Sequence, residues 1–285
     1  MKNLSIVGFK DEADLVRAFA KRSKLKPQFV ETGRYRAGEL NLVGPNKPAR
    51  KVFVVANVWE KPESLFRILS LAHELRHAGA KLVYLVAPWI AYGRQDRPAK
   101  LGDEATGLML GKLFSAMFDK IVTLDAHSEY FIKSFKGRLV NVSPWGEIDM
   151  QEKTDLVVAP DQGATSRASL AADALGVPFI VMEKKRAGKK VSSRLPPGIK
   201  VKGAHVLMVD DMADSGGTLK AAAVVLKKAG VKRIAATVSH AFDLLALHAY
   251  LTPEVDAVDC YFDHKSGLLA EAALEELIST IRREM

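Results

Sequence analysis

The sequence predicts an α/β protein of two domains, each with a mostly parallel sheet flanked by helices. Short apolar strands alternate with helices along the chain, which is the pattern of parallel strands joined by right-handed crossovers. The pattern restarts after Pro144, and 285 residues are enough for two domains of ordinary size. We therefore expect one domain over residues 1–142 and a second over residues 143–285.

The first half begins with a helix expected over residues 12–22, where Leu15, Val16 and Phe19 share one side. Pro27 ends this region, and residues 34–43 are expected to form a hairpin at a sheet edge. The elements expected after it are, in order, a strand at 52–56, a helix from Pro62 to about His77, a strand at 82–87, a long basic loop at 89–103, a helix at 104–118 and a strand at 121–124.

The second half repeats the alternation of strands and helices. Its expected elements are a strand at 156–159, a helix at 166–175, a strand at 179–182, a charged loop at 183–202, a strand at 206–209, a helix ended by Gly230 and a strand at 234–238. Aligning FDKIVTLDAHSEYF with GVKRIAATVSHAFD pairs Ile121 with Ile234 and His127 with His240. This predicts an internal duplication, with the loop at 89–103 in the place of the loop that follows residues 206–209.

The composition is that of a globular protein, with 48% hydrophobic and 26% charged residues. No apolar run approaches the roughly 18 residues that a membrane helix needs. The N-terminal residues lack an apolar core of signal-peptide length, and the single cysteine, Cys260, cannot form an internal disulfide. We therefore expect a protein of the reducing cytoplasm.

The net charge of +9, from 42 basic and 33 acidic residues, requires anionic partners to be considered. The basic residues are spread along the chain, apart from a cluster at 184–194, and no nucleic-acid-binding motif is present. We therefore expect small anionic substrates rather than nucleic acid or a membrane surface.

The segment VLMVDDMADSGGT predicts a phosphate-binding loop between a strand and a helix. Small residues at such a junction let backbone N–H groups surround an anion, and the positive end of the following helix adds to the attraction. The paired acids before the loop can bind neutral hydroxyls or a cation, so a phosphorylated sugar suits the whole segment. An ordinary Gly- and Asp-rich turn is the alternative. The residues concerned are Asp210, Asp211, Asp214, Ser215, Gly216, Gly217 and Thr218.

Four further segments carry candidate site residues. In PWIAYGRQDRPAK, Arg94 and Arg97 offer planar charged groups suited to phosphate oxygens, and Gln95 adds an amide between them. His127 and Asp161 each follow a strand and could help to hold a divalent ion. The stretch KKRAGKKVSS contains Lys184, Lys185 and Arg186, and its composition is typical of a mobile loop. Solvated surface is the alternative reading of each basic segment.

A competing motif lies in the helix expected from Pro62 to His77. His73, Glu74 and His77 form H-E-x-x-H, a spacing that puts both imidazoles on one helix face and suits Zn²⁺. A metalloprotease also needs a third ligand, and the usual extension is absent because Gly79 ends the helix. We expect the helix to pack Leu65, Ile68, Leu69 and Ala72 inward and to leave its histidines near the surface.

Taken together, these segments resemble those of ribose-phosphate pyrophosphokinases. YGRQDR is similar to the arginine motif that contacts ATP in that family, and the phosphate loop is shared with type I phosphoribosyltransferases. KKR is similar to the family's K-R-R motif, with Lys185 in place of an arginine. PDQGA is similar to its S-P-D-x-G-[GA] motif, with Ala159 in place of serine. RYRAGEL is similar to the segment that recognises adenine, with Ala37 in place of aspartate.

The resemblance implies two tandem type I phosphoribosyltransferase-like domains that make 5-phosphoribosyl 1-diphosphate and AMP from Mg-ATP and ribose 5-phosphate. It implies catalytic roles for Lys184 and Arg186, Mg²⁺ contacts from His127 and Asp161, and a homo-oligomer with shared active sites. It also implies ATP contacts from Tyr35, Gly38, Glu39, Arg94, Gln95 and Arg97. A phosphoribosyltransferase that uses this product and a non-catalytic regulatory relative are the alternatives.

Overall fold

The computed structural model describes residues 3–98, 100, 102–146, 148, 153–187 and 190–284, without the side chains of residues 184–191 and 284. The chain divides into two compact units. Unit 1 comprises Met1–Val142 with Leu274–Met285, and unit 2 comprises Ser143–Ala273. The expected division at 1–142 and 143–285 is therefore wrong for the C-terminal helix α8 (Glu271–Glu284), most of which belongs to unit 1. An ion pair joins its Glu275 to Arg22 of that unit.

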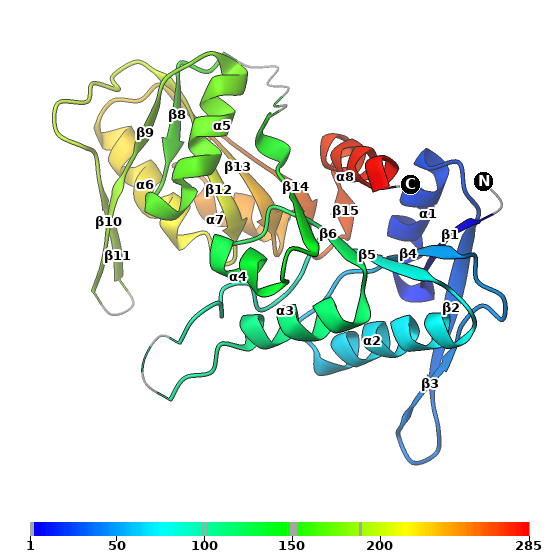
Figure 1. The fold of residues 1–285 in the computed structure, drawn as a ribbon. Helices are drawn as coiled ribbons and strands as arrows, with labels where there is room; N and C mark the ends of the chain where they lie inside the picture. Colours follow the sequence, from blue (N-terminus) through cyan, green and yellow to red (C-terminus); the bar gives the residue numbers. More distant parts are fainter. Residues whose placement is uncertain are drawn as a thin grey trace. The chain divides into compact units, whose positions relative to one another are not determined.

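Unit 1 is built on a seven-stranded sheet in the order β3-β2-β1-β4-β5-β6-β7, in which β2 and β3 alone pair antiparallel among the described strands. Helix α1 covers one face, and helices α2 and α3 pack on the other (Figure 1). The strands are β1 (Leu4–Phe9), β2 (Pro27–Arg34), β3 (Leu40–Val43), β4 (Lys51–Val55), β5 (Leu82–Val86), β6 (Lys120–Leu124) and β7 (Leu139–Val142); the helices are η1 (Lys10–Glu12), α1 (Ala13–Arg22), α2 (Pro62–His77), α3 (Thr106–Met117) and α4 (Glu129–Ser134).

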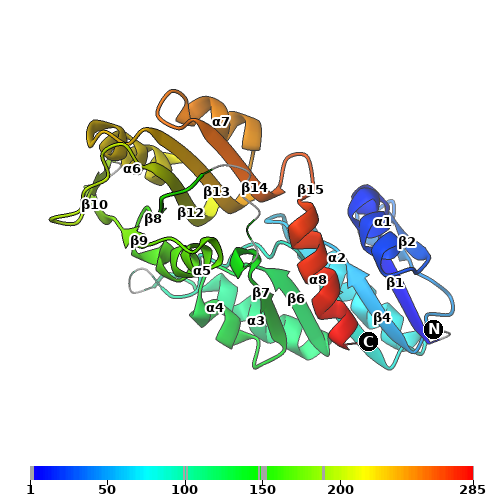
Figure 2. The ribbon, with the colours of Figure 1, turned by 90° about the horizontal axis from the view of Figure 1, so that it is seen from above.

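Unit 2 is built on a six-stranded sheet in the order β15-β14-β13-β12-β8-β9, parallel except for β15. A separate two-stranded hairpin, β10–β11, follows β9 (Figure 2). The strands are β8 (Leu156–Ala159), β9 (Phe179–Val181), β10 (Glu183–Ala187), β11 (Lys190–Arg194), β12 (His205–Ala213), β13 (Arg233–Ala241), β14 (Ala257–Asp263) and β15 (Leu268–Leu269); the helices are η2 (Pro144–Gly146), η3 (Gln162–Ala164), α5 (Thr165–Leu175), α6 (Gly217–Lys228) and α7 (Leu244–Leu251).

The two sheets share a topology. In spatial order, strands β2-β1-β4-β5-β6 of unit 1 correspond to strands β9-β8-β12-β13-β14 of unit 2. Strand β5 is therefore equivalent to β13, and β6 is equivalent to β14. The sequence alignment, which matched Ile121 in β6 with Ile234 in β13, is wrong by one strand. The phosphate loop follows β12, and its counterpart in unit 1 is the segment after β4, not the basic loop after β5. Both aligned segments contain an apolar strand and a histidine, His127 shortly after β6 and His240 near the end of β13, and the strand order separates them.

The expected helices are found within a few residues of their predicted ends, but two strand assignments change. Strand β12 extends to Ala213 rather than stopping at Val209, so Asp210 and Asp211 are strand residues. Much of the expected loop at 183–202 is the hairpin β10–β11, in which Lys184 pairs with Ser193 and satisfies backbone groups that a loop would leave to water.

The H-E-x-x-H motif lies in helix α2, whose burial pattern shows which residues face the core. In this helix Ile68 and Ala72 are fully buried and Leu65 and Leu69 are partly buried against the core, whereas both histidines are exposed. The described residues contain no group of three or more metal-ligating side chains arranged around an ion. No helix in the described ranges is both long and apolar enough to cross a membrane.

Candidate active site

The phosphate loop, residues 214–218, joins the carboxyl end of β12 to the first turn of α6. The first amides of a helix have no intrahelical acceptor, so the start of α6 offers backbone donors and the positive end of a helix dipole. Strand β12 is central in its sheet, between β8 and β13. Ligands of parallel α/β sheets bind at this edge, beyond the carboxyl ends of the strands.

Gly216 gives the loop its tight turn. It precedes α6 with φ of 71°, a left-handed conformation that side-chain-bearing residues rarely adopt. A Cβ at this position would also lie 2.6 Å from Cδ1 of Leu247 in α7. Both backbone conformation and space therefore require glycine, and α7 holds the loop closely from behind.

The paired acids lie at the end of β12 in a shielded position. Asp211 is buried, and its Oδ2 lies 3.9 Å from Nη2 of Arg167, which is also buried. Arg167 donates from Nη1 to the carbonyl of Gly163 at 3.1 Å. Burial and the adjacent Asp211 charge raise the pKa of Asp210 well above its usual value, and Asp161 adds to the effect. The pair therefore carries less negative charge than two solvated carboxylates.

Asp161 follows β8, the strand beside β12, so it lies at the same sheet edge as Asp210. Its Oδ1 accepts from the amide of Gly163 at 2.8 Å and caps η3. The Asp161 charge contributes to the raised pKa of Asp210, so the two carboxyl groups lie near one another at the strand ends. Because they form no closed ligand set with the other described residues, an ion here would need oxygens from substrate and water.

In unit 1, the arginine loop, residues 92–97, follows β5. Arg94, Gln95 and Arg97 are exposed, whereas Asp96 is 5% exposed and accepts from the hydroxyl of Ser128. Arg97 lies with Nε 3.6 Å from Asp96 Oδ1 and with its guanidinium 5.3 Å from the centroid of the Tyr130 ring. Asp96 thus anchors the loop internally and leaves the three predicted ligands at the surface.

His127 lies beside this loop. It follows β6, the neighbour of β5, and is half-buried. A Cβ on Gly93 would lie 3.5 Å from the Cβ of His127, which places His127 next to the loop backbone. The structure therefore brings together Arg94, Gln95, Arg97 and His127, four of the predicted site residues of unit 1.

The remaining predicted ATP contacts of unit 1 lie elsewhere. Tyr35, Gly38 and Glu39 form the tip of the β2–β3 hairpin, where the amide of Gly38 donates to the carbonyl of Tyr35 at 2.9 Å. Tyr35 is 59% exposed. Strand β2 is three positions from β5 in the sheet, roughly 14 Å at ordinary strand spacing. Within one chain, the hairpin tip and the arginine loop do not form a single compact pocket.

The two predicted catalytic cations lie on the hairpin of unit 2. Lys184 and Arg186 are alternate residues of β10, which pairs antiparallel with β11. These side chains lie outside the described part of the chain. The two residues share one strand, which fits a common role.

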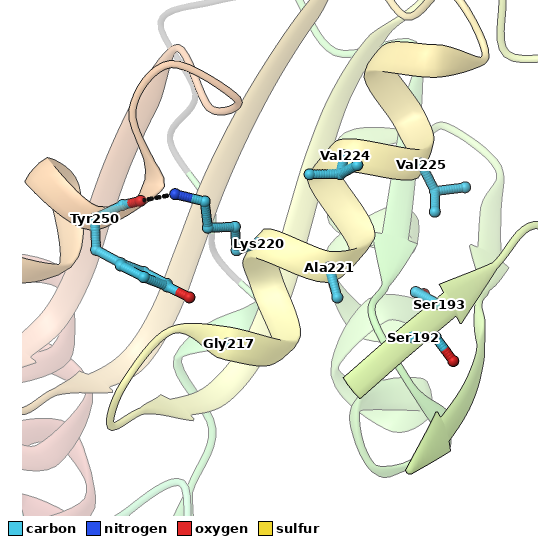
Figure 3. Close-up of a pocket in the computed structure, with 8 residues that line it drawn as sticks. All are labelled: Ser192, Ser193, Gly217, Lys220, Ala221, Val224, Val225 and Tyr250. Atoms are coloured by element: carbon cyan, nitrogen blue, oxygen red, sulfur yellow. Dashed lines mark hydrogen bonds between the residues drawn. The ribbon is translucent and has the colours of Figure 1, made fainter. Parts of the chain in front are cut away.

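A cavity of about 460 Å³ lies beside the phosphate loop (Figure 3). Lys220 of α6 donates to the carbonyl of Tyr250 at 2.6 Å, and its ammonium lies 4.3 Å from the centre of that ring. These contacts attach the first turns of α6 to α7. The lining residues come from β11, α6 and α7: Ser192, Ser193, Gly217, Lys220, Ala221, Val224, Val225 and Tyr250.

Sequence reasoning missed three side chains that shape these sites. Arg167 sits near Asp211, Asp96 anchors the arginine loop, and Leu247 closes the space behind Gly216. Asp96 stands inside the motif GRQDR and could have been proposed as its anchor. The other two carry no local signal, because they come from elements distant in the sequence.

Tandem phosphoribosyltransferase-like sheets, one with a phosphate loop and one with an arginine loop, define a class of enzymes that act on phosphorylated sugars. Comparison with known proteins supports this class. The profile of the N-terminal domain of ribose phosphate pyrophosphokinase matches residues 4–117, and that of the phosphoribosyl transferase domain matches residues 145–260.

Relatives and solved structures agree with these profiles. Ribose-phosphate pyrophosphokinase from Thermococcus kodakarensis is 33% identical over 215 residues, 74% of this chain and 77% of the relative. The Pyrococcus furiosus protein is 31% identical with the same coverage. The crystal structure of phosphoribosylpyrophosphate synthetase from Mycobacterium smegmatis superposes with a TM-score of 0.78 at 21% identity, covering 99% of both chains, which shows the shared fold.

The chain belongs to the ribose-phosphate pyrophosphokinase family. It is therefore a transferase of the kinase type with the phosphoribosyltransferase fold, and its activity is that of a ribose-phosphate diphosphokinase. The fold class and the enzyme class predicted from the sequence are confirmed.

Proposed function

We propose that unit 1 binds ATP, that unit 2 binds ribose 5-phosphate, and that the enzyme transfers the diphosphoryl group of ATP to ribose 5-phosphate. The arginine loop presents Arg94, Gln95 and Arg97 at the surface beside His127, which suits the phosphates of a nucleotide. The phosphate loop offers helix amides for the 5-phosphate. The observation that supports ribose 5-phosphate as the ligand of unit 2 is the pair Asp210 and Asp211, which lies shortly before that loop, where the ribose hydroxyls would lie.

In the proposed reaction, the 1-hydroxyl oxygen of ribose 5-phosphate attacks the β-phosphorus of ATP. The bond from that phosphorus to the oxygen bridging to the α-phosphorus breaks, and AMP leaves. The hydroxyl proton is lost as the new bond forms. Positioning and charge neutralisation carry such a transfer, so no covalent enzyme intermediate is needed. Lys184 and Arg186 would stabilise the charge that develops on the diphosphoryl group.

The residues present suit Mg²⁺ as the cofactor. Mg²⁺ is commonly held by one or two protein ligands together with substrate phosphates and water, so a closed ligand set is not required. Asp161 lies near Asp210 at the sheet edge of unit 2, and His127 adjoins the arginine loop of unit 1. When bound, the ion would neutralise charge on the phosphates of ATP.

A homo-oligomer with shared active sites is part of the proposal. The hairpin tip with Tyr35, Gly38 and Glu39 lies three strand positions from the arginine loop, and Tyr35 is exposed. Adenine recognition by this tip is therefore better served by a neighbouring subunit. We also propose a cytoplasmic location, since Cys260 is the single cysteine of the chain and burial raises the pKa of its thiol to about 12.

The test is to incubate the purified protein with Mg-ATP and ribose 5-phosphate and to measure AMP. AMP rather than ADP identifies diphosphoryl transfer. Asp211→Asn should raise the KM for ribose 5-phosphate far more than the KM for ATP, whereas Arg94→Ala should do the reverse. Asp173→Asn, on the exposed side of α5, serves as the matched control.

Three outcomes would contradict the proposal. Equal losses for both substrates in Asp211→Asn would show that the two ends of the site are misassigned. Release of pyrophosphate from 5-phosphoribosyl 1-diphosphate and a base, without AMP formation from ATP, would identify a phosphoribosyltransferase. Absence of both activities would leave a regulatory relative.

A further inference from the structure

A buried carboxylate at the start of α1 is outside the proposed catalytic machinery. Glu12 has an 8% exposed side chain, and its Oε1 accepts from the amide of Asn57 at 3.1 Å and from Nε1 of Trp59 at 3.0 Å. Arg67 of α2 completes the group, with Nη2 3.4 Å from Oε2 of Glu12. We refer to Glu12, Asn57, Trp59 and Arg67 as the Glu12 cluster.

Arg67 holds the carboxylate from the helix side. Its guanidinium lies 4.2 Å from the centre of the buried Phe9 ring, and Nη1 reaches the exposed Asp11 at 2.5 Å. The Arg67 side chain is 12% exposed, so the ion pair with Glu12 is largely shielded from water. Removing one partner of a shielded ion pair costs more stability than removing one partner of an exposed ion pair.

The segment that Glu12 holds, residues 57–59, is bonded directly to the chain entering the arginine loop. Oδ1 of Asn57 accepts from the amide of Trp89 at 3.0 Å. The backbone of Val58 bonds on both sides, donating to the carbonyl of Trp89 at 2.8 Å and accepting from the amide of Ala91 at 2.8 Å. A β-bridge between Val58 and Ile90 results.

The bonding continues into the arginine loop. The Tyr92 hydroxyl donates to the carbonyl of Glu60, one residue beyond the held segment. The amide of Gln95 donates to the carbonyl of Tyr92 at 2.9 Å, and the carbonyl of Gln95 accepts from the amide of Gly107 at 3.0 Å. A continuous series of bonds therefore runs from Glu12 to Gln95, directly beside Arg94.

We propose that the Glu12 cluster positions the arginine loop for nucleotide binding, which makes Glu12 and Asn57 positioning residues of the reaction. This inference rests on the proposed function of the arginine loop. Exposed arginines bind phosphate well only if the backbone that carries them is held in place, because ordering the loop on binding would otherwise reduce affinity.

The experiment compares Glu12→Ala, which removes the acceptor, with Glu12→Gln, which keeps a neutral acceptor. Glu12→Ala should raise the KM for ATP about tenfold, leave the KM for ribose 5-phosphate within about twofold and change kcat little. Glu12→Gln should recover part of the loss. Asp11→Asn is the matched control, because it removes the exposed partner of Arg67 and leaves the bonds to Asn57 and Trp59 in place.

A second readout is independent of catalysis. Amide hydrogen exchange at Val58, Trp89 and Ala91 should be faster in Glu12→Ala and unchanged in Asp11→Asn. If Glu12→Ala does not fold, Trp59→Phe removes one donor of the cluster and is measured in the same two ways, with the same directions expected.

Unchanged exchange at all three amides would overturn the inference. Faster exchange with an unchanged KM for ATP would also overturn it, because the loop would then bind nucleotide without the cluster. Equal increases in both KM values would indicate a general structural role and overturn it too. A wild-type protein that forms no AMP counts against the proposed function instead, and titration with Mg-ATP then replaces the KM comparison.

Discussion

Two segments at equivalent places in the two units behave in opposite ways. After β12, the chain turns through Gly216 into α6 and offers the first amides of the helix to a ligand. After β4, the amides of Asn57, Val58 and Trp59 are all bonded within the unit, to the Glu12 carboxylate, the Trp89 carbonyl and the Ser64 hydroxyl. One topology thus carries the proposed phosphate loop in unit 2 and a self-bonded segment in unit 1.

The difference shows how duplicated domains can divide their roles. In unit 1, the Glu12 carboxylate accepts hydrogen bonds from an amide and an indole N–H after β4, whereas the equivalent position after β12 in unit 2 is the proposed phosphate loop. The candidate ligands of unit 1 move to the next strand end, after β5, where Arg94 and Arg97 are exposed. The hairpins of the two units also carry different candidate residues. The tip of β2–β3 carries Tyr35, a predicted ATP contact, whereas β10 carries Lys184, a predicted catalytic residue.

The largest expected effect tests the comparison of hairpins. Lys184→Ala should lower kcat by about 10²–10³-fold and weaken ATP binding only modestly, because the proposed contact forms mainly in the transition state. Steady-state kinetics and a Mg-ATP titration check this. Lys200→Ala, an exposed lysine after the hairpin, is the control. Near-normal turnover in Lys184→Ala would remove this residue from the catalytic list.

The next effect tests the proposed phosphate loop of unit 2. Gly216→Ala combines a positive φ of 71° with a Cβ 2.6 Å from Cδ1 of Leu247, so the loop backbone is strained and the Leu247 side chain must shift. We expect use of ribose 5-phosphate to fall by at least about tenfold while the KM for ATP stays close to normal.

Gly176→Ala is the matched control for that loop variant. Gly176 also has a positive φ, of 66°, but nothing lies within 4 Å of an added Cβ. It should cost about 1 kcal/mol of unfolding free energy and leave both KM values unchanged. If the two variants behave alike, the tight approach of Leu247 is unimportant and the comparison loses its structural basis.

A smaller effect tests the self-bonded segment of unit 1. Burial raises the pKa of Glu12 from 4.5 to about 6, although Arg67 and the Asn57 amide oppose the shift and Asp11 adds slightly to it. A raised folded-state pKa means that the folded protein binds the proton more tightly than the unfolded chain. The resulting stability is fully present below pH 4.5 and is lost as the pH rises through about 6.

The difference in unfolding free energy between wild type and Glu12→Gln should therefore shift by about 2 kcal/mol between pH 4 and pH 7, in favour of the wild type at low pH. Denaturant titrations at several pH values measure it. A difference independent of pH would show that Glu12 is solvated or fully neutralised by Arg67.

The smallest effect concerns the hairpin tip of unit 1. Ala37, close to Tyr35 in the chain, stands where the adenine-recognising segment that RYRAGEL resembles has aspartate. The proposed adenine site therefore lacks one polar contact to the base. Ala37→Asp should sharpen preference for ATP over GTP or CTP by about 0.5–1.5 kcal/mol, the value of one net hydrogen bond. Competition among nucleotide donors measures it. A wild type that already uses ATP alone, with no change in the variant, would mean that adenine is recognised elsewhere.

The sequence by itself determined the alternation of strands and helices, and hence the fold class, because apolar periodicity and helix-ending residues act locally. It also predicted the phosphate loop and the arginine loop, since their residue types are continuous in the chain. It could not assign the strand equivalences, and it aligned β6 with β13 because each is an apolar segment with a histidine near its carboxyl end. Strand order depends on pairing between distant segments and leaves no local pattern.

Only the tertiary structure decided which polar side chains become buried and what they bond. Nothing in the sequence near Glu12, at the start of a helix, marks it as buried. In the folded chain, Arg67 of α2 lies over Phe9 of β1 and shields the Glu12 carboxylate from water. Arg167 is likewise an ordinary helix residue until the pairing of β8 with β12 places Asp211 near it. Burial and charge pairing are properties of several elements at once, so they appear only after the chain has folded.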